Sequence, residues 1–193
     1  MELLIKRIKE SGQNLGNGIL KVDGFINHQV DPMLMDACGE ELARRFKDCG
    51  ATRILTAEIS GIGPALMTGK YMQLPVVYAR KHKPITMPDQ VFLTLAPSHT
   101  KGRMVELIVS PDYLKGGERI LIIDDFLASG ATIAGLVRLV EVAGAELVGI
   151  GALVEKLFEG GRAMLSRPGL QIESLACITN MDDDTITFGS PDQ

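Results

Sequence analysis

Apolar residues recur along the chain in two patterns, and the alternation of these patterns predicts the fold class. Short continuous runs of aliphatic residues are typical of strands buried on both faces, and longer stretches with apolar residues three or four positions apart are typical of amphipathic helices. The strand pattern occupies residues 53–58, 75–79, 120–124, 146–153 and 172–178. Helical stretches follow at residues 64–72, 131–143 and 158–166. This alternation predicts an α/β fold with a mostly parallel, open sheet flanked by helices.

The residues before the first predicted strand add two helices and a small lobe. Residues 2–10 carry a helical pattern, and a second helix is predicted to begin at Asp31-Pro32 and to reach about residue 48. Between these helices, apolar runs on both sides of Asp23-Gly24 predict a β-hairpin that turns at these two residues. Ligands of open α/β sheets bind at the carboxyl ends of the strands. We therefore expect one domain, residues 1–193, in which residues 12–31 form a hood over that edge.

A long polar segment between two predicted strands is expected to be a mobile lid. Residues 82–103 contain three prolines and several basic residues, and their polar stretches lie around two short extended runs at 91–95 and 103–109. A segment of this kind inside a compact domain is more often a functional loop than a structural connection. We expect an antiparallel excursion from the sheet whose loops close over the site.

The strongest candidate for chemistry is residues 120–132, where a buried strand meets a loop of small residues. The apolar run ends in two carboxylates, Asp124 and Asp125, which are therefore expected at the carboxyl end of the strand. Residues 128–132 follow, and they offer backbone N–H groups, two hydroxyls and a helix N-terminus, which together can bind an anion. Carboxylates beside an anion site favour a ligand with both hydroxyls and phosphate, such as a phosphorylated sugar.

This segment resembles the sugar-donor loop of the type I phosphoribosyltransferases. Over nearly its whole length the chain resembles the bacterial xanthine branch of that family, and the likeness is carried by residues 15–29, 57–63, 78–81 and 154–156. The loop has Ser129-Gly130 where the commonest sequence in the family is Thr-Gly, and serine keeps the hydroxyl. The resemblance implies transfer of the 5-phosphoribosyl group from 5-phosphoribosyl-1-pyrophosphate to N9 of xanthine. The products of this purine-salvage reaction are xanthosine monophosphate and pyrophosphate.

The resemblance also implies a role for each motif. Asp124 and Asp125 match the pair that contacts the ribose hydroxyls, and they are the candidate catalytic residues. The candidate purine contacts are Leu20, Asn27 and Lys156, and Lys156 matches the position that meets the purine 6-oxo group. The candidate sugar-donor contacts are the 5-phosphate loop Ala128, Ser129, Gly130, Ala131 and Thr132, the pyrophosphate-loop residues Ser60 and Gly61, and the basic pair Arg80 and Lys81.

Structural interpretations and other substrates stay open beside this one. Residues 60–63 also fit an ordinary strand-to-helix loop, and a lone lysine such as Lys156 usually lies on a solvated surface. An ammonium group donates hydrogen bonds and accepts none, so Lys156 disfavours adenine but only weakly excludes guanine or hypoxanthine. A different class of protein is a purine regulator that binds the sugar donor without turnover. Such regulators carry an N-terminal DNA-binding domain, for which the early start of the hood leaves no room.

Composition narrows the expected partners. The formal net charge of −4, with 20 Lys and Arg residues, argues against a nucleic-acid surface, and no apolar run approaches the length of a membrane span. Cys38, Cys49 and Cys177 form no C-x-x-C pair and are expected to be free thiols in a reducing cytoplasm. The histidines lack metal-ligand spacing. With the implied sugar donor we expect Mg²⁺, which would bridge pyrophosphate and ribose oxygens and keep its waters at a site with few fixed protein ligands. The family resemblance implies a homodimer.

Overall fold

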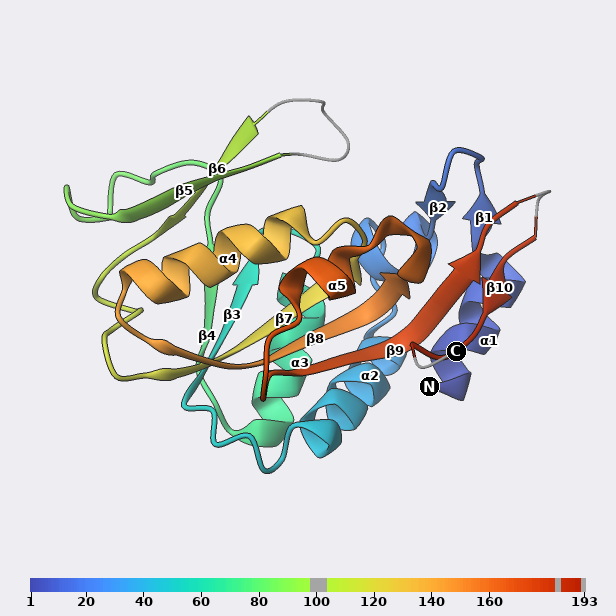
Figure 1. The fold of residues 1–193 in the computed structure, drawn as a ribbon, viewed down its shortest axis with the longest axis horizontal. Coiled ribbons are helices and arrows are strands. Elements are labelled where there is room, and N and C mark those ends of the chain that lie inside the picture. The colour runs from blue at the N-terminus through green and yellow to red at the C-terminus, as the bar shows by residue number, and fades with distance from the viewer. Residues whose placement is uncertain (98–103, 183–184, 192–193) are drawn as a thin grey trace.

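In the computed structural model, which describes residues 1–97, 104–182 and 185–191, a six-stranded sheet lies between two layers of helices (Figure 1). The strand order is β10-β9-β8-β7-β3-β4. The parallel strands are β3 (Arg53–Ala57), β4 (Val76–Ala79), β7 (Arg119–Leu127), β8 (Glu146–Lys156) and β9 (Gln171–Asn180). The short strand β10 (Thr187–Phe188) pairs antiparallel with β9 at one edge. The predicted fold class, a mostly parallel sheet flanked by helices, is confirmed.

Helices cover both faces of this sheet. One face packs against α1 (Glu2–Ser11), α2 (Pro32–Arg45) and α3 (Ile62–Met72). The other face packs against α4 (Ala131–Val142) and the short helix α5 (Gly161–Leu165), which follows the 3₁₀ turn η2 (Leu157–Glu159) (Figure 1). None of the helices in the described part of the chain is long and apolar enough to cross a bilayer.

Strand β7 shows why the sheet is buried on both faces. Its residues Leu121 and Ile123 belong to the core beneath α2, whereas Ile120 and Ile122 belong to the core beneath α4, and all four are 0% exposed. Successive side chains of a strand point to opposite faces, so a continuous apolar run serves two cores at once. The apolar run in the sequence is therefore a consequence of the three-layer architecture.

The start of α2 follows the sequence signal for a helix N-terminus. The Asp31 carboxylate accepts hydrogen bonds from the backbone N–H groups of Met33 and Leu34, and Pro32 occupies the first helical position. A cap of this kind contributes about 1 kcal/mol to helix stability. The side chains of Met35, Cys38, Leu42 and Phe46, three or four positions apart, are buried against the sheet.

Two small antiparallel sheets stand apart from the central one. Strands β5 (Phe92–Pro97) and β6 (Met104–Val109) pair with each other, which confirms the predicted antiparallel excursion. This hairpin packs against α4, and the Arg138 guanidinium of α4 donates a hydrogen bond to the Leu95 carbonyl at 2.7 Å. Residues 98–103 of the predicted lid lie outside the described residues. Strands β1 (Gln13–Asn14) and β2 (Leu20–Lys21) form the other pair, within the predicted hood.

The predicted hairpin turn at Asp23-Gly24 is wrong. The chain turns instead at residues 16–18, where Gly16, Asn17 and Gly18 all have positive φ angles. Residues Asp23–Asn27 form a helical turn, η1. The neighbouring side chains of Phe25 and Ile26 are both buried, at 1% exposure each, and a strand would direct one of two neighbours away from the core.

The predicted end of the strand at Asp124 is also wrong. Strand β7 continues to Leu127, because Phe126 and Leu127 remain paired with Val154 and Glu155 of β8. The predicted helix at 158–166 is likewise divided into η2 and α5. The acidic pair therefore lies near the carboxyl end of the strand, as expected, but two residues of paired strand follow it.

Gly39 allows the helices α2 and α3 to pack closely against each other. A Cβ atom at this position would lie 2.3 Å from the Met67 Cβ and 2.8 Å from the Thr68 nitrogen. We predict that Gly39→Ala lowers the free energy of unfolding by about 1–3 kcal/mol through overpacking, although alanine favours helices. Chemical denaturation measures the change, with Gly24→Ala as the control because a Cβ at Gly24 meets nothing within 4 Å. Equal stability of the two variants would contradict the close packing of α2 and α3 at Gly39.

Candidate active site

The acidic pair on β7 is buried at the carboxyl edge of the sheet. Asp124 is 5% exposed and Asp125 is 8% exposed. The Asp125 backbone N–H donates to the Asp124 carboxylate at 3.0 Å. Burial, followed by the neighbouring negative charge of Asp125, raises the pKa of Asp124 well above its ordinary value. Two charged carboxylates at this position therefore need a cation or hydroxyl donors from a ligand.

The loop that enters α3 lies directly against this pair. A Cβ atom at Gly61 would lie 2.4 Å from an Asp124 carboxylate oxygen and 2.2 Å from the Thr56 hydroxyl, so no larger residue fits there. Thr56 is fully buried, and its hydroxyl has no hydrogen-bond partner among the described residues. Ser60 is half-buried beside Gly61. The backbone of this loop at Gly61 is thus packed directly against the Asp124 carboxylate.

The basic pair Arg80 and Lys81 follows β4 and is held by Glu58, a residue whose role the sequence left undefined. The Glu58 carboxylate accepts from the Lys81 backbone N–H at 2.7 Å, and it lies 3.6 Å from Arg80 Nε. The Lys81 charge acts on Asp124 and opposes the increase in its pKa. The charge of Lys81 is therefore within range of the acidic pair, and Glu58 holds Arg80 beside it.

The candidate phosphate loop connects β7 to α4. Gly130 has a φ angle of +78° and stands at the N-terminal cap of α4, where the backbone N–H groups of Ala131 and Thr132 begin the helix. The positive end of the helix dipole favours an anion at such a position. The loop is also held from outside, because the Gly161 N–H donates to the Ala128 carbonyl at 3.0 Å. Ser129 is half-buried in the same loop.

Lys156 connects the end of β8 to the hood. Its ammonium group donates to the Gly18 carbonyl at 2.7 Å and to the Glu159 carboxylate at 3.1 Å. It also lies 5.7 Å from the centre of the Phe126 ring. An ammonium group has three donors, so these two hydrogen bonds leave one donor for a ligand.

The two hood residues proposed as purine contacts differ in their surroundings. Leu20 is buried in the core cluster against which Phe126 also packs, and it follows Gly18, whose carbonyl accepts from Lys156, by two residues. Asn27 is exposed at the end of η1, and its side chain makes no hydrogen bond to other described residues. The structure thus places Lys156 over Phe126 and Leu20 in the hood strand close to the Gly18 contact, but it gives Asn27 no polar partner among the described residues.

Two cavities in the described part of the chain are lined by neither the acidic pair, the Gly61 loop, residues 128–132 nor Lys156. The smaller one, of about 270 Å³, is lined by Gly18, whose carbonyl accepts from Lys156, and by Phe158 and Asn180. A larger groove of about 450 Å³ between α2 and α3 is lined by Gly50 and Leu74, which precede β3 and β4. The larger groove therefore lies at the amino ends of the strands, where ligands of open α/β sheets do not bind.

Glu58, Thr56 and Glu159 are site residues that the sequence pattern did not identify as such. Glu58 carried a signal, because it is a charged residue directly after an apolar strand run. Thr56 and Glu159 carried none, since their importance comes from contacts with Gly61 and Lys156 that only the folded chain makes.

Comparison with known proteins defines the class to which this fold and site belong. Residues 40–185 match the family described as the phosphoribosyl transferase domain, and the chain belongs to this family. Adenine phosphoribosyltransferase from Rhodothermus marinus has the same fold, with a TM-score of 0.71, 22% identity, and coverage of 92% of this chain and 100% of that one. The enzyme of the same name from Thermoanaerobacter pseudethanolicus gives a TM-score of 0.66 at 27% identity, covering 76% and 82% of the two chains.

Relatives with higher sequence identity carry a different base in their name. Xanthine phosphoribosyltransferase from Lactobacillus delbrueckii is 47% identical over 188 residues, which cover 97% of this chain and 100% of that protein. The corresponding proteins from Latilactobacillus sakei and Pseudomonas entomophila are 45% and 43% identical, and the matches cover 97% of this chain and 96% and 99% of those proteins.

The raised pKa of Asp124 predicts a specific dependence of stability on pH. A group whose pKa is higher in the folded than in the unfolded chain loses its stabilising contribution as the pH rises through the folded pKa. Asp124→Asn removes this titration. We predict that the variant unfolds at a higher denaturant concentration than the wild type at neutral pH. Its free energy of unfolding should be higher by about 1.4 kcal/mol for each unit by which folding raises the pKa of Asp124.

This advantage should disappear as the pH approaches 3.8, the ordinary pKa of the group. Denaturation curves across this range provide the measurement. Asp48→Asn is the matched control, because the Asp48 side chain is 89% exposed. A difference between wild type and Asp124→Asn that does not change with pH would contradict the raised pKa.

Proposed function

We propose that the chain transfers the 5-phosphoribosyl group from 5-phosphoribosyl-1-pyrophosphate to N9 of xanthine, giving xanthosine monophosphate and pyrophosphate. One observation carries the proposal: the buried pair Asp124 and Asp125 lies between a glycine-lined loop and a helix N-terminus, with Lys156 on the adjacent strand. The glycine-lined loop would meet the pyrophosphate, the acidic pair the ribose hydroxyls, the helix N-terminus the 5-phosphate, and Lys156 the base. The names of the bacterial relatives support xanthine as the base.

The sugar donor would be held at both ends by backbone and charge. Residues 128–132 would bind the 5-phosphate through N–H groups at the start of α4. Ser60 and Gly61 would let the backbone approach the pyrophosphate closely, with Arg80 and Lys81 supplying positive charge. Asp124 and Asp125 would accept hydrogen bonds from the ribose 2- and 3-hydroxyls, which would relieve the repulsion between the two carboxylates.

Catalysis would then consist of positioning and electrostatic stabilisation. N9 of the base attacks C1 of the ribose as the bond from C1 to the pyrophosphate oxygen breaks. Positive charge develops on the sugar ring and negative charge on the leaving pyrophosphate. The buried carboxylates would lie near the first charge, and the Gly61 loop, which adjoins Asp124, would lie with Lys81 near the second. Preorganised groups of this kind lower the barrier because they need no reorganisation during the reaction.

Mg²⁺ fits this site as a companion of the sugar donor. The described residues contain no cluster of three metal-ligating side chains, but two adjacent carboxylates supply oxygen atoms of the kind that Mg²⁺ prefers. Asp124 and Asp125 would hold the hydrated ion through its water molecules, together with substrate oxygens. When bound, the ion supplies positive charge against the pyrophosphate.

The remaining parts of the proposal concern the surroundings of the site. Residues 12–31 would form the wall of the purine pocket, since the Gly18 carbonyl already receives a hydrogen bond from Lys156. Residues 82–103 would close over the sugar donor and exclude water, which otherwise hydrolyses it. We place the enzyme in the cytoplasm as a homodimer.

The choice of base follows from the unused donor of Lys156. That donor can meet a 6-oxo group but not the 6-amino group of adenine. We predict that xanthine is a substrate and that kcat/KM for adenine is at least about 100-fold lower, because a mismatched buried polar group is strongly penalised. Initial rates with xanthine, guanine, hypoxanthine and adenine at one fixed donor concentration test this directly.

A lysine substitution separates the role of Lys156 from a general loss of charge. Lys156→Met should reduce kcat/KM for xanthine, whereas Lys47→Met should not, because the Lys47 side chain is 71% exposed and distant from the sheet edge. Guanine turnover equal to that of xanthine would replace the proposed substrate by 6-oxopurines in general. Adenine turnover equal to that of xanthine would overturn the assignment.

A further inference from the structure

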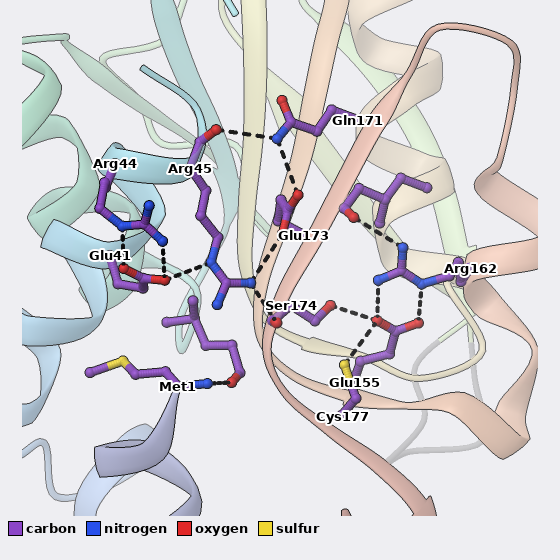
Figure 2. Close-up of polar contacts among 12 residues, drawn as sticks. Met1, Glu41, Arg44, Arg45, Glu155, Arg162, Gln171, Glu173, Ser174 and Cys177 are labelled. Carbon is purple, nitrogen blue, oxygen red and sulfur yellow. Dashed lines mark hydrogen bonds and ion pairs between the residues drawn. The ribbon is translucent and has the colours of Figure 1, made fainter. Parts of the chain in front are cut away.

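A third buried carboxylate, Glu155, lies immediately before Lys156 on β8. It is 1% exposed, and the reaction described above does not use it. The Arg162 guanidinium binds it through two nitrogens, with Nε at 2.8 Å from one carboxylate oxygen and Nη2 at 2.6 Å from the other (Figure 2). The Ser174 hydroxyl donates to the same carboxylate at 2.6 Å. A bidentate pair of this kind has one defined geometry and is sensitive to the loss of either partner.

Arg162 attaches the helix α5 to the sheet. Besides the two hydrogen bonds to Glu155 on β8, its Nη1 donates to the Ile172 carbonyl of β9 at 3.0 Å (Figure 2). Because Glu155 and Arg162 are seven positions apart, their contact closes residues 155–162 into a ring. The conformation of the segment inside that ring is therefore tied to this ion pair.

The closed segment carries contacts to both halves of the candidate site. At its beginning, Lys156 and Glu159 are hydrogen-bonded to each other on the purine side. At its end, Gly161 touches the phosphate loop, where its N–H donates to the Ala128 carbonyl at 3.0 Å. A Cβ atom at Gly161 would lie 2.2 Å from that carbonyl oxygen and 2.6 Å from the Gly130 nitrogen. A shift of this segment would consequently move the Lys156 ammonium and the phosphate loop together.

We propose that Glu155 and Arg162 are positioning residues that set the binding of both substrates at once. This inference rests on the proposed function, because it assigns the purine to Lys156 and the sugar donor to residues 128–132. The pair touches neither substrate. It fixes the segment between β8 and α5, and through that segment it holds the purine-binding lysine and the phosphate loop in register with one another.

Two variants of Arg162 test the proposal. Arg162→Ala removes the whole contact, and Arg162→Lys keeps the charge but cannot form the bidentate pair and the Ile172 bond together. We expect Arg162→Lys to raise KM for xanthine and for 5-phosphoribosyl-1-pyrophosphate by about tenfold each, since small displacements of binding groups have large kinetic effects. Arg162→Ala should show a larger defect in both constants. If the alanine variant fails to fold, the lysine variant alone carries the test.

Arg45→Lys is the matched control for a purely structural effect. Arg45 at the end of α2 also joins a helix to β9, because its Nη1 donates to the Glu173 carboxylate at 3.0 Å and to the Ser174 carbonyl at 3.2 Å (Figure 2). Its Nε donates to Glu41 of its own helix at 2.8 Å. None of these partners belongs to the candidate site. The Arg45 side chain is 23% exposed, against 25% for Arg162. Both lysine variants should lose thermal stability, but only Arg162→Lys should change the two KM values.

The possible outcomes separate this inference from the proposed function. If the wild type does not convert xanthine, the proposed function fails. If the wild type is active and Arg162→Lys keeps both KM values, or changes only one of them, the positioning role is wrong. Equal kinetic defects in Arg162→Lys and Arg45→Lys would also contradict it, because they would show that general loosening of β9 is sufficient.

Discussion

Two neighbouring carboxylates, buried at the edge where parallel strands end, constrain most of what surrounds them. Asp124 and Asp125 repel each other and have lost most of their contact with water, which raises the pKa of Asp124. The chain places Gly61 beside them, where any side chain would collide, and brings the charge of Lys81 within range. These features make the pair unfavourable in the free protein and suited to a ligand that supplies hydroxyl groups and a cation.

The parallel sheet brings the remaining groups to the same edge. The ends of β3, β4, β7 and β8 carry the Gly61 loop, the basic pair, the acidic pair with the phosphate loop, and Lys156, respectively. Each group is then tied to its neighbours by a local contact, such as Glu58 to Lys81 and Lys156 to Gly18. The site is thus rigid where strands support it and depends on buried pairs, such as Glu155 and Arg162, where a loop departs from the sheet.

Periodicity and local motifs predicted the sheet and the loop of residues 128–132, because both depend on residues that are neighbours in the sequence. The turn of the hood was wrongly placed, since Asp23-Gly24 is a strong hairpin signal and the burial of Phe25 and Ile26 is a tertiary effect. The role of Arg162 could not be predicted, because it depends on a contact that forms only when α5 packs on β8. The one available signal was Glu155, a charged residue at the end of an apolar run.

Proton release on binding of the sugar donor tests the central claim most directly. If the donor and Mg²⁺ meet the acidic pair, they stabilise the charged form of Asp124 and lower its pKa, so protons must leave the protein. Calorimetric titration in two buffers of different ionisation enthalpy counts these protons at slightly acidic pH. The account predicts proton release by the wild type that is reduced in Asp124→Asn. Equal release by both proteins, or proton uptake by the wild type, would show that the donor binds elsewhere.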